Sequence, residues 1–193
     1  MPALHSYALT SLADLKLFLD ITTSAKDDLL RLLINCTTDF IEKYCGRRFK
    51  STVYTNEEYD GTGTPDLPLN QYPIITFTTL SVNNYVDNQD DWETVASTDY
   101  FVYTNEGMLK LISNTLQTPQ RYRATYTAGY ATIPSDLEWA CLKICAKTYL
   151  RRLGEGVESE RLGDHAIVWI TDVLQMDKEL KAILDLYKRH YIG

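Results

Sequence analysis

The chain has 193 residues, 45% of them hydrophobic and 23% charged, which is an ordinary composition for a soluble globular protein with its own core. Its formal net charge is -7, from 19 basic and 26 acidic side chains, and this argues against tight binding of nucleic acid, which depends on clustered Lys and Arg. The start of the chain has no basic leader and no apolar run reaches the length of a membrane span, so we expect a soluble protein made in the cytoplasm, without membrane contact.

The first 45 residues predict two helices. A Ser followed three residues later by an acid, just before an apolar periodic run, is typical of a helix N-terminus. Ser11 and Ser24 both stand in this pattern, which predicts one helix to about Leu19 and a second to about Tyr44. Gly46 follows the second helix, where a left-handed C-cap favours glycine.

The second helix has a predicted core face and a predicted outer face. Residues at i, i+3 and i+4 spacing form its apolar stripe, which we expect to be buried. The stripe consists of Leu29, Leu30, Leu33, Ile34, Thr37, Phe40, Ile41 and Tyr44, and the opposite side carries Arg31, Asn35, Thr38, Asp39 and Glu42.

Residues 51–128 form a predicted β section. The hydrophobic period changes here to two, with β-branched and aromatic residues between Gly, Pro, Asn and Asp. Turns are expected at 87–90 and at 104–107, the second ending in a glycine. Tyr122, Ala124, Tyr126 and Ala128 should share one face of the last strand. About five antiparallel strands follow from this pattern.

A third helix is predicted from Ser135, which Glu138 follows at capping-box spacing, to about Leu153. It is apolar nearly all round, apart from a narrow i, i+4 stripe of basic residues. A helix of this kind needs cover from several directions, so we expect a neighbouring copy to contribute. The predicted subunit interface consists of Trp139, Lys143, Lys147 and Arg151.

The chain closes with a polar loop at 154–160, a short alternating run at 165–170 and a helix at 177–191. Leu180, Ile183, Leu184, Tyr187 and Tyr191 lie along one face of that helix. Its end is basic, with Lys188, Arg189 and His190, and no acidic partner is evident nearby in the sequence.

These elements predict an α+β fold. We expect about four bundled helices with an inserted antiparallel β section, in one domain over residues 1–193. The section at 51–128 would separate N-terminal helices at 11–45 from C-terminal helices at 135–191.

No catalytic or cofactor motif stands out. The four cysteines, Cys36, Cys45, Cys141 and Cys145, lack the C-x-x-C spacing of a zinc site and are expected to be small core residues. The Gly61-Thr62-Gly63 segment precedes prolines and predicts a turn, because a phosphate-binding loop needs a helix directly after it. We therefore expect no cofactor, no metal and no enzymatic activity.

Two other functions remain open at this point. One is a β-rich ligand-binding module, for example for carbohydrate, with Trp92, Tyr100 and Tyr103 as stacking surfaces. The other is a small metal-dependent hydrolase that uses the acidic pairs Asp27-Asp28, Glu57-Glu58 and Asp90-Asp91.

The order of the pieces resembles the head-to-tail connector proteins of tailed bacteriophages, also called adaptor or head-completion proteins. No single motif is specific, and the series covers nearly the whole chain. The similar stretches are Leu12–Leu19, Asp27–Leu30, Leu33-Ile34, Phe40–Glu42, Tyr44–Phe49, Tyr59–Gly61, Pro73-Ile74, Tyr126–Tyr130, Pro134, Asp136-Leu137, Ala140-Cys141, Gly163-Asp164, Leu184 and Tyr187–Arg189.

The resemblance implies a structural virion protein at the neck, between head and tail. Such a subunit would form a homo-oligomeric ring of about twelve copies. The ring would lie between the portal protein and a stopper or tail-completion protein, and DNA would pass through its lumen without specific binding. In relatives the C-terminal region grips the portal, so the resemblance points to Tyr187, Lys188, Arg189, His190 and Tyr191 as the portal contact.

Overall fold

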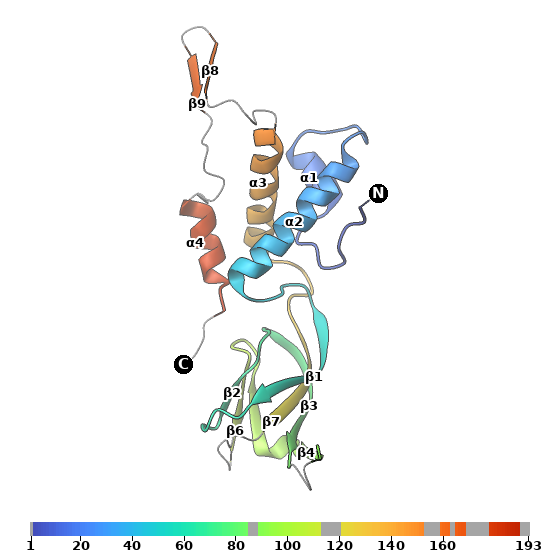
Figure 1. Ribbon diagram of the computed structural model, residues 1–193, viewed down its shortest axis with the longest axis vertical. Helices are drawn as coiled ribbons and strands as arrows, with labels where there is room; N and C mark the ends of the chain where they lie inside the picture. The colour runs from blue at the N-terminus through green and yellow to red at the C-terminus, as the bar shows by residue number, and fades with distance from the viewer. Residues whose placement is uncertain are drawn as a thin grey trace. The chain divides into compact units, whose positions relative to one another are not determined.

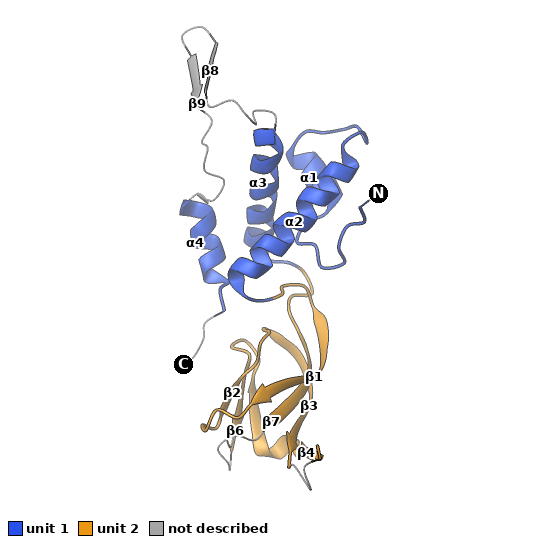
Figure 2. Ribbon diagram, in the orientation of Figure 1, with its two compact units in different colours: residues 1–47, 133–190 blue, residues 48–132, 191–193 orange. Residues whose placement is uncertain are grey.

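The structure, a computed structural model, describes residues 2–84, 89–112, 121–152, 159–162, 165–168 and 178–189. The chain divides into two compact units. Residues 1–47 and 133–190 make the first, and residues 48–132 and 191–193 make the second (Figure 2). All the α-helices that the structure describes lie in the first unit, and the two larger sheets lie in the second, so the predicted α+β class is confirmed.

Four helices form the helical unit (Figure 1): α1 (Leu12–Phe18), α2 (Asp27–Cys45), α3 (Ser135–Arg151) and α4 (Lys178–Leu186). The helix α3 packs against the other three, and α2 also contacts α1 and α4. This explains why α3 is apolar nearly all round: the helical unit itself covers it from three directions. In the described part of the chain, no helix combines the length and the hydropathy needed to cross a bilayer.

The predicted helix ends are confirmed in part. The Ser11 hydroxyl accepts a hydrogen bond from the Asp14 backbone N–H at 3.1 Å, and Gly46 takes the left-handed conformation with φ 68°. The predicted caps at Ser24 and Ser135 are wrong. The N-cap residues are Lys26 for α2 and Pro134 for α3, and neither side chain forms a capping hydrogen bond. The helix α2 begins after a turn from Ser24 to Asp27, and α3 begins directly after the proline.

The buried face of α2 is rotated from the predicted one. Phe40 is exposed, whereas Asn35 and Thr38, predicted to face outward, are buried. The N-terminal segment covers that side of the helix. Asn35 accepts a bond from the His5 backbone N–H at 2.9 Å and donates one to the Ala3 carbonyl oxygen, also at 2.9 Å. Thr38 accepts a bond from the Leu9 backbone N–H at 3.3 Å. These bonds satisfy side chains whose burial alone would destabilise the fold.

The β unit contains two antiparallel sheets. The four-stranded sheet has the order β1-β7-β3-β4, and the three-stranded sheet has the order β2-β6-β5 (Figure 1). The strands are β1 (Thr52–Asp60), β2 (Asp66–Pro68), β3 (Ile74–Asn83), β4 (Trp92–Val95), β5 (Tyr100–Tyr103), β6 (Met108–Leu111) and β7 (Arg121–Ala128). A 3-10 turn, Ser97–Asp99, precedes β5. The described part of this section thus has seven strands, where about five were predicted.

The two sheets share one hydrophobic core. As predicted, every second residue of β7 from Tyr122 to Ala128 is buried, and Leu67 and Leu109 of the other sheet belong to the same cluster. Inside it the Tyr126 hydroxyl donates to Glu57 at 2.5 Å and lies 3.0 Å from the Tyr59 hydroxyl. Burial, and then the Glu57 carboxylate, raise the pKa of both tyrosines. Both hydroxyls therefore stay protonated and hold β1 against β7.

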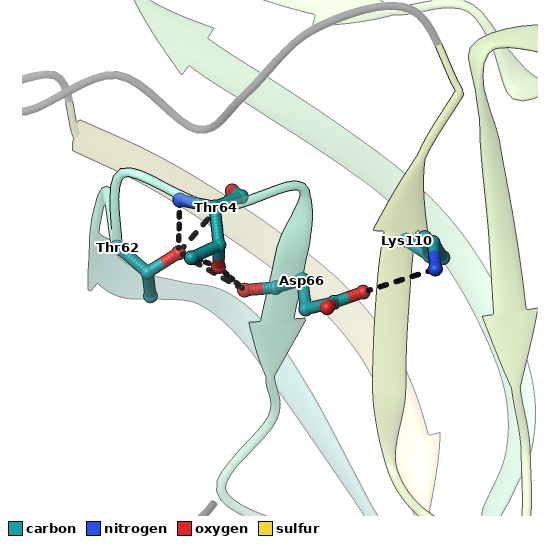
Figure 3. Close-up of polar contacts among 4 residues, drawn as sticks. All are labelled: Thr62, Thr64, Asp66 and Lys110. Carbon is teal, nitrogen blue, oxygen red and sulfur yellow. Dashed lines mark hydrogen bonds and ion pairs between the residues drawn. The ribbon is translucent and has the colours of Figure 1, made fainter. Parts of the chain in front are cut away.

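The predicted turn at Gly61–Gly63 joins β1 to β2, and hydrogen bonds hold it closed (Figure 3). The Thr62 hydroxyl accepts from the Thr64 backbone N–H at 3.3 Å and donates to the Asp66 carbonyl oxygen at 3.0 Å. Asp66 in turn forms an ion pair with Lys110 of β6 at 3.9 Å. Gly63 has φ 75°, a conformation that favours glycine.

The other predicted turn segments have different outcomes. Gly107 adopts φ 65° between the antiparallel pair β5 and β6, which confirms the predicted hairpin. Of the predicted turn at 87–90, residues 87 and 88 lie outside the described residues. In the C-terminal part, β8 (Ser159–Leu162) pairs antiparallel with β9 (His165–Val168) within the region predicted as a loop and an alternating run.

We expect Leu30→Ala to lower the free energy of unfolding by about 2 to 5 kcal/mol, because it leaves a cavity at a fully buried position of α2. Leu32→Ala is the matched control, since it makes the same change two residues away at a side chain that is 49% exposed. Chemical denaturation of both variants measures the difference. Equal losses would show that the buried face of α2 is assigned wrongly.

Candidate functional site

Surfaces are the candidate sites of this chain, since the predicted contacts are with other proteins. The predicted portal contact begins at the end of α4. Tyr187 donates its hydroxyl to Asp136 at the start of α3, with a distance of 2.6 Å. The Arg189 backbone N–H donates to the Cys45 carbonyl oxygen at the end of α2, at 2.8 Å. Residues 187–189 are therefore attached to the helical unit.

Asp185 is the centre of a charged cluster beside this segment. Its carboxylate accepts bonds from the Tyr44 hydroxyl at 2.6 Å and the Lys181 ammonium at 2.8 Å, and forms an ion pair with Lys188 at 3.0 Å. The hydrogen bond from Lys181, followed by those from Tyr44 and Lys188, holds the pKa of the Asp185 carboxyl well below its usual range. The Lys188 ammonium also lies 4.1 Å from the centre of the Tyr44 ring, a cation–π contact.

This cluster corrects the expectation that the basic end has no acidic partner nearby in the sequence. Asp185 stands three residues before Lys188, so the two side chains meet on one face at i, i+3 spacing. Lys188 thus stabilises the fold of the helical unit, while a role of Tyr187, Lys188 and Arg189 toward a partner stays a prediction. His190 and Tyr191 lie outside the described residues.

The predicted subunit interface lies along one face of α3. Trp139 is 41% exposed and meets the Phe18 ring of α1 edge to face, with ring centres 5.3 Å apart. The Lys143 ammonium lies 5.3 Å from the centre of the Trp139 ring. Lys147 is exposed and Arg151 is half-buried. The helical spacing therefore brings the four predicted side chains into one row, whose role as an interface stays a prediction.

Sequence reasoning missed two further surface features. The first is a pair of open apolar grooves beside α1, of about 600 and 300 Å³, both lined by Leu17, which is 82% exposed. Trp139 and Phe18 line the smaller one. The position of Leu17, two residues after the buried Leu15, was the available signal, because residues two apart cannot share a helix face.

The second missed feature is the outer row of α2. We use this name for Leu32, Cys36 and Phe40, at i, i+4 and i+8, together with Asp28, Asp39 and Lys43 beside them. All six are exposed. The sequence predicts Phe40 in the core because its spacing fits the apolar stripe as well as the exposed row.

The aromatic residues of the predicted ligand-binding module do not form a stacking platform. Tyr100 is buried in the core of the β unit. Tyr103 lies on the three-stranded sheet, whereas Trp92 belongs to the four-stranded one and stacks under the Arg123 guanidinium at 4.4 Å. The geometry therefore does not favour this alternative.

The acidic pairs of the predicted hydrolase belong to separate elements and have structural partners. Asp27 pairs with Lys16, Asp28 with Arg31 and Glu58 with Arg121. The Asp90 carboxylate accepts a bond from Asn83 at 2.7 Å. Among the described residues no three His, Cys, Asp or Glu side chains come together as a metal site.

Three of the four cysteines lie in the core of the helical unit, and Cys36 is exposed. Burial raises the pKa of the Cys45 thiol to about 11, so this thiol stays protonated at neutral pH. The Cys145 thiol lies 3.3 Å from the Thr37 hydroxyl between α2 and α3. These contacts place Cys45 and Cys145 among the packing residues of the unit.

The comparison with protein families is decisive for identity. The model of the head completion protein family matches residues 8–190. The chain belongs to the head completion protein family. This match confirms the predicted family. A search of curated proteins gave no match.

Solved structures share the fold of this head completion protein. A chain in the neck of an empty gene transfer agent (GTA) particle, computed with C6 symmetry, superposes with a TM-score of 0.63 at 16% identity, over 100% of this chain and 95% of that one. A chain of the native GTA virion gives 0.63 at 17% identity, with the same coverage. A chain in the native GTA neck, computed with C12 symmetry, gives 0.53 at 19% identity and 96% of each chain.

The Asp185 cluster should make stability depend on pH. A depressed carboxyl pKa in the folded state contributes stability above the unfolded value of about 4, and this contribution is lost as the pH falls below it. Asp185→Asn should therefore be less stable than wild type at pH 7, and the difference should close as the pH falls toward 2.

Urea denaturation at low salt across this pH range measures the effect. Glu179→Gln is the matched control, since it removes one charge from the same helix and leaves Tyr44, Lys181 and Lys188 in place. A difference between wild type and Asp185→Asn that stays constant from pH 7 to pH 2 would contradict the account.

Proposed function

We propose that the chain is a non-enzymatic structural subunit of a tailed-phage neck. About twelve copies would form a ring between the portal and a stopper or tail-completion protein, and DNA would pass through the lumen. The family match over residues 8–190 carries this proposal, because it spans both units of the chain. The cyclic symmetry stated for two of the solved necks supports the ring.

The charge of the chain suits a passage for DNA. Each copy has a formal net charge of -7, so a ring adds these charges around the lumen. A negative surface repels phosphate, and tight binding would need clustered cations to release counterions. DNA can therefore move through the ring without being held.

We place the portal contact at the end of the chain, from Tyr187 to Tyr191. The first three of these residues are fixed to the helical unit by Asp136, Asp185 and Cys45. The part of the chain that the structure describes therefore ends at a fixed point, beside the end of α2. The exposed side chain of Leu186, on the last turn of α4, lies next to this point and offers apolar surface to a partner.

Deletion of the gene for this chain tests the function. Assembly without the chain should end at DNA-filled heads that have a portal and no tail. Supplying the gene from a plasmid should restore tailed particles. Electron microscopy of purified particles gives the readout. Heads that join tails normally without this chain would contradict a role in head completion.

Truncation tests the portal contact. A chain that ends at Arg189 keeps the described contacts of Tyr187, Lys188 and Arg189, so its melting temperature should change by less than about 4 °C, equivalent to about 1 kcal/mol at this length. Its binding to purified portal rings should be lost. The full chain is the reference, measured at low and high salt because contacts between exposed charges weaken with screening. If the truncated chain kept the affinity of the full chain for portal rings at both salt concentrations, the portal contact would lie elsewhere in the chain.

A further inference from the structure

One exposed row of side chains runs along α2 and another along α3. The two helices pack against each other, with the Cys145 thiol 3.3 Å from the Thr37 hydroxyl, and each helix buries one face in the helical unit. Residues opposite a buried stripe face away from the packing partner. The outer row of α2 and the row along α3 therefore both face away from the core of the unit.

The outer row of α2 is apolar along its centre and mainly acidic at its edges. Leu32 and Phe40 are 49% and 39% exposed, with the exposed Cys36 between them. The charged residues in the row are Asp28, which also pairs with Arg31 of the same helix, Asp39 and Lys43. At 1.5 Å per residue, Leu32 and Phe40 stand about 12 Å apart along the helix.

The outer row of α3 consists of Trp139, Lys143, Lys147, Leu150 and Arg151. It has one exposed apolar side chain near each end, and its other three residues are basic. Trp139 and Leu150 are 41% and 52% exposed, and about 16 Å separates them along the helix. Lys143 lies over the Trp139 ring, and its charge and those of Lys147 and Arg151 are all positive. No acidic residue occurs between Trp139 and Arg151.

The two rows are complementary, because both expose apolar side chains while their charges are mainly of opposite sign. Exposed apolar side chains gathered in a patch with charged edges are typical of protein contacts. A contact of the α3 row with itself would set three cations against like charges, so this row needs a surface that carries acids, as the α2 row does. A contact between unlike rows pairs acids with bases, and a head-to-tail contact between two unlike surfaces of each copy is the kind that builds a ring of many copies.

We propose that the outer row of α2 in one copy docks on the outer row of α3 in the next copy of the ring. The inference rests on the proposed neck function and adds the two surfaces that join its subunits. Leu32 and Phe40 bury apolar area against Trp139 and Leu150. Asp28 and Asp39 face Lys143, Lys147 and Arg151.

The exposed thiol of Cys36 allows a direct test by disulfide cross-linking. Lys143→Cys and Lys147→Cys place a second thiol on the α3 row, at exposed or half-exposed positions where the fold tolerates it. The other natural cysteines are buried and do not compete. Assembled particles that carry each variant are treated with a mild oxidant and run on a denaturing gel without reductant.

At least one of the two variants should give a ladder of cross-linked multimers. Its yield should exceed that of Glu179→Cys, an exposed control position on α4, by at least about tenfold, because docking holds the two thiols at high effective concentration. Adding Cys36→Ser to the positive variant should abolish the ladder. Wild-type particles, with Cys36 alone, should stay uncross-linked.

The outcomes separate the inference from the function it rests on. Particles with a normal neck and no ladder from either variant would overturn the docking of these rows and leave the ring in place. A cross-linked dimer in wild type would also overturn it, because Cys36 would then meet Cys36. Particles whose necks contain this chain without a ring would overturn the proposed function itself.

Charge reversal gives a second readout that needs no added thiol. Lys147→Glu should lower the yield of tailed particles, and Asp39→Lys in the same chain should restore part of the loss, since the two reversals recreate opposite charges across the contact. The circular dichroism spectrum of each purified variant checks that it is folded. No rescue, with both variants folded, would count against the proposed pairing of the rows.

Discussion

The packing of α2 against α3 is the interaction on which the helical unit depends. Leu30, Ile34 and Ile41 of α2 are buried in this unit, whereas Leu32, Cys36 and Phe40 on the other side of the helix stay exposed. The N-terminal segment helps to set the rotation of α2 in this packing, because its backbone forms hydrogen bonds with the buried side chains of Asn35 and Thr38. The same bonds that complete the core therefore help to determine that Leu32, Cys36 and Phe40 face outward. An interface on α2 follows from how the interior of the unit is built.

The β unit is held together by its own core. Its two sheets bury a cluster around Tyr126, and the hydroxyl groups of Tyr59 and Tyr126 share the Glu57 carboxylate. This buried polar network has partners for each of its members, as stable networks require. A unit with a complete core can present its surface to a partner without help from the helices. The two units can thus serve separate contacts in the particle.

Patterns with a local cause could be read from the sequence. The period of two in β7 and the glycine after α2 predicted the buried side of a strand and the end of a helix, since both depend on neighbouring residues only. The row of side chains along one face of α3 was predicted from helical spacing in the same way. Asn35 and Thr38 could not be assigned to the core, because their partners lie about 30 residues earlier in the chain and hydrogen bonds between distant segments leave no periodic signal. Phe40 was misplaced for another reason, since its helical spacing fits the buried stripe as well as the exposed row. The ion pair of Asp185 and Lys188 could be predicted, since i, i+3 spacing is visible in the sequence.

We infer that this head completion protein joins copies of itself through unlike helix faces into a closed ring. A cryo-electron microscopy reconstruction of the neck, refined without imposed symmetry, is the decisive measurement. It should show a closed ring in which Leu32 and Phe40 of each copy contact Trp139 and Leu150 of the next. A neck in which these four side chains face solvent, or in which the copies meet through the β units alone, would contradict it.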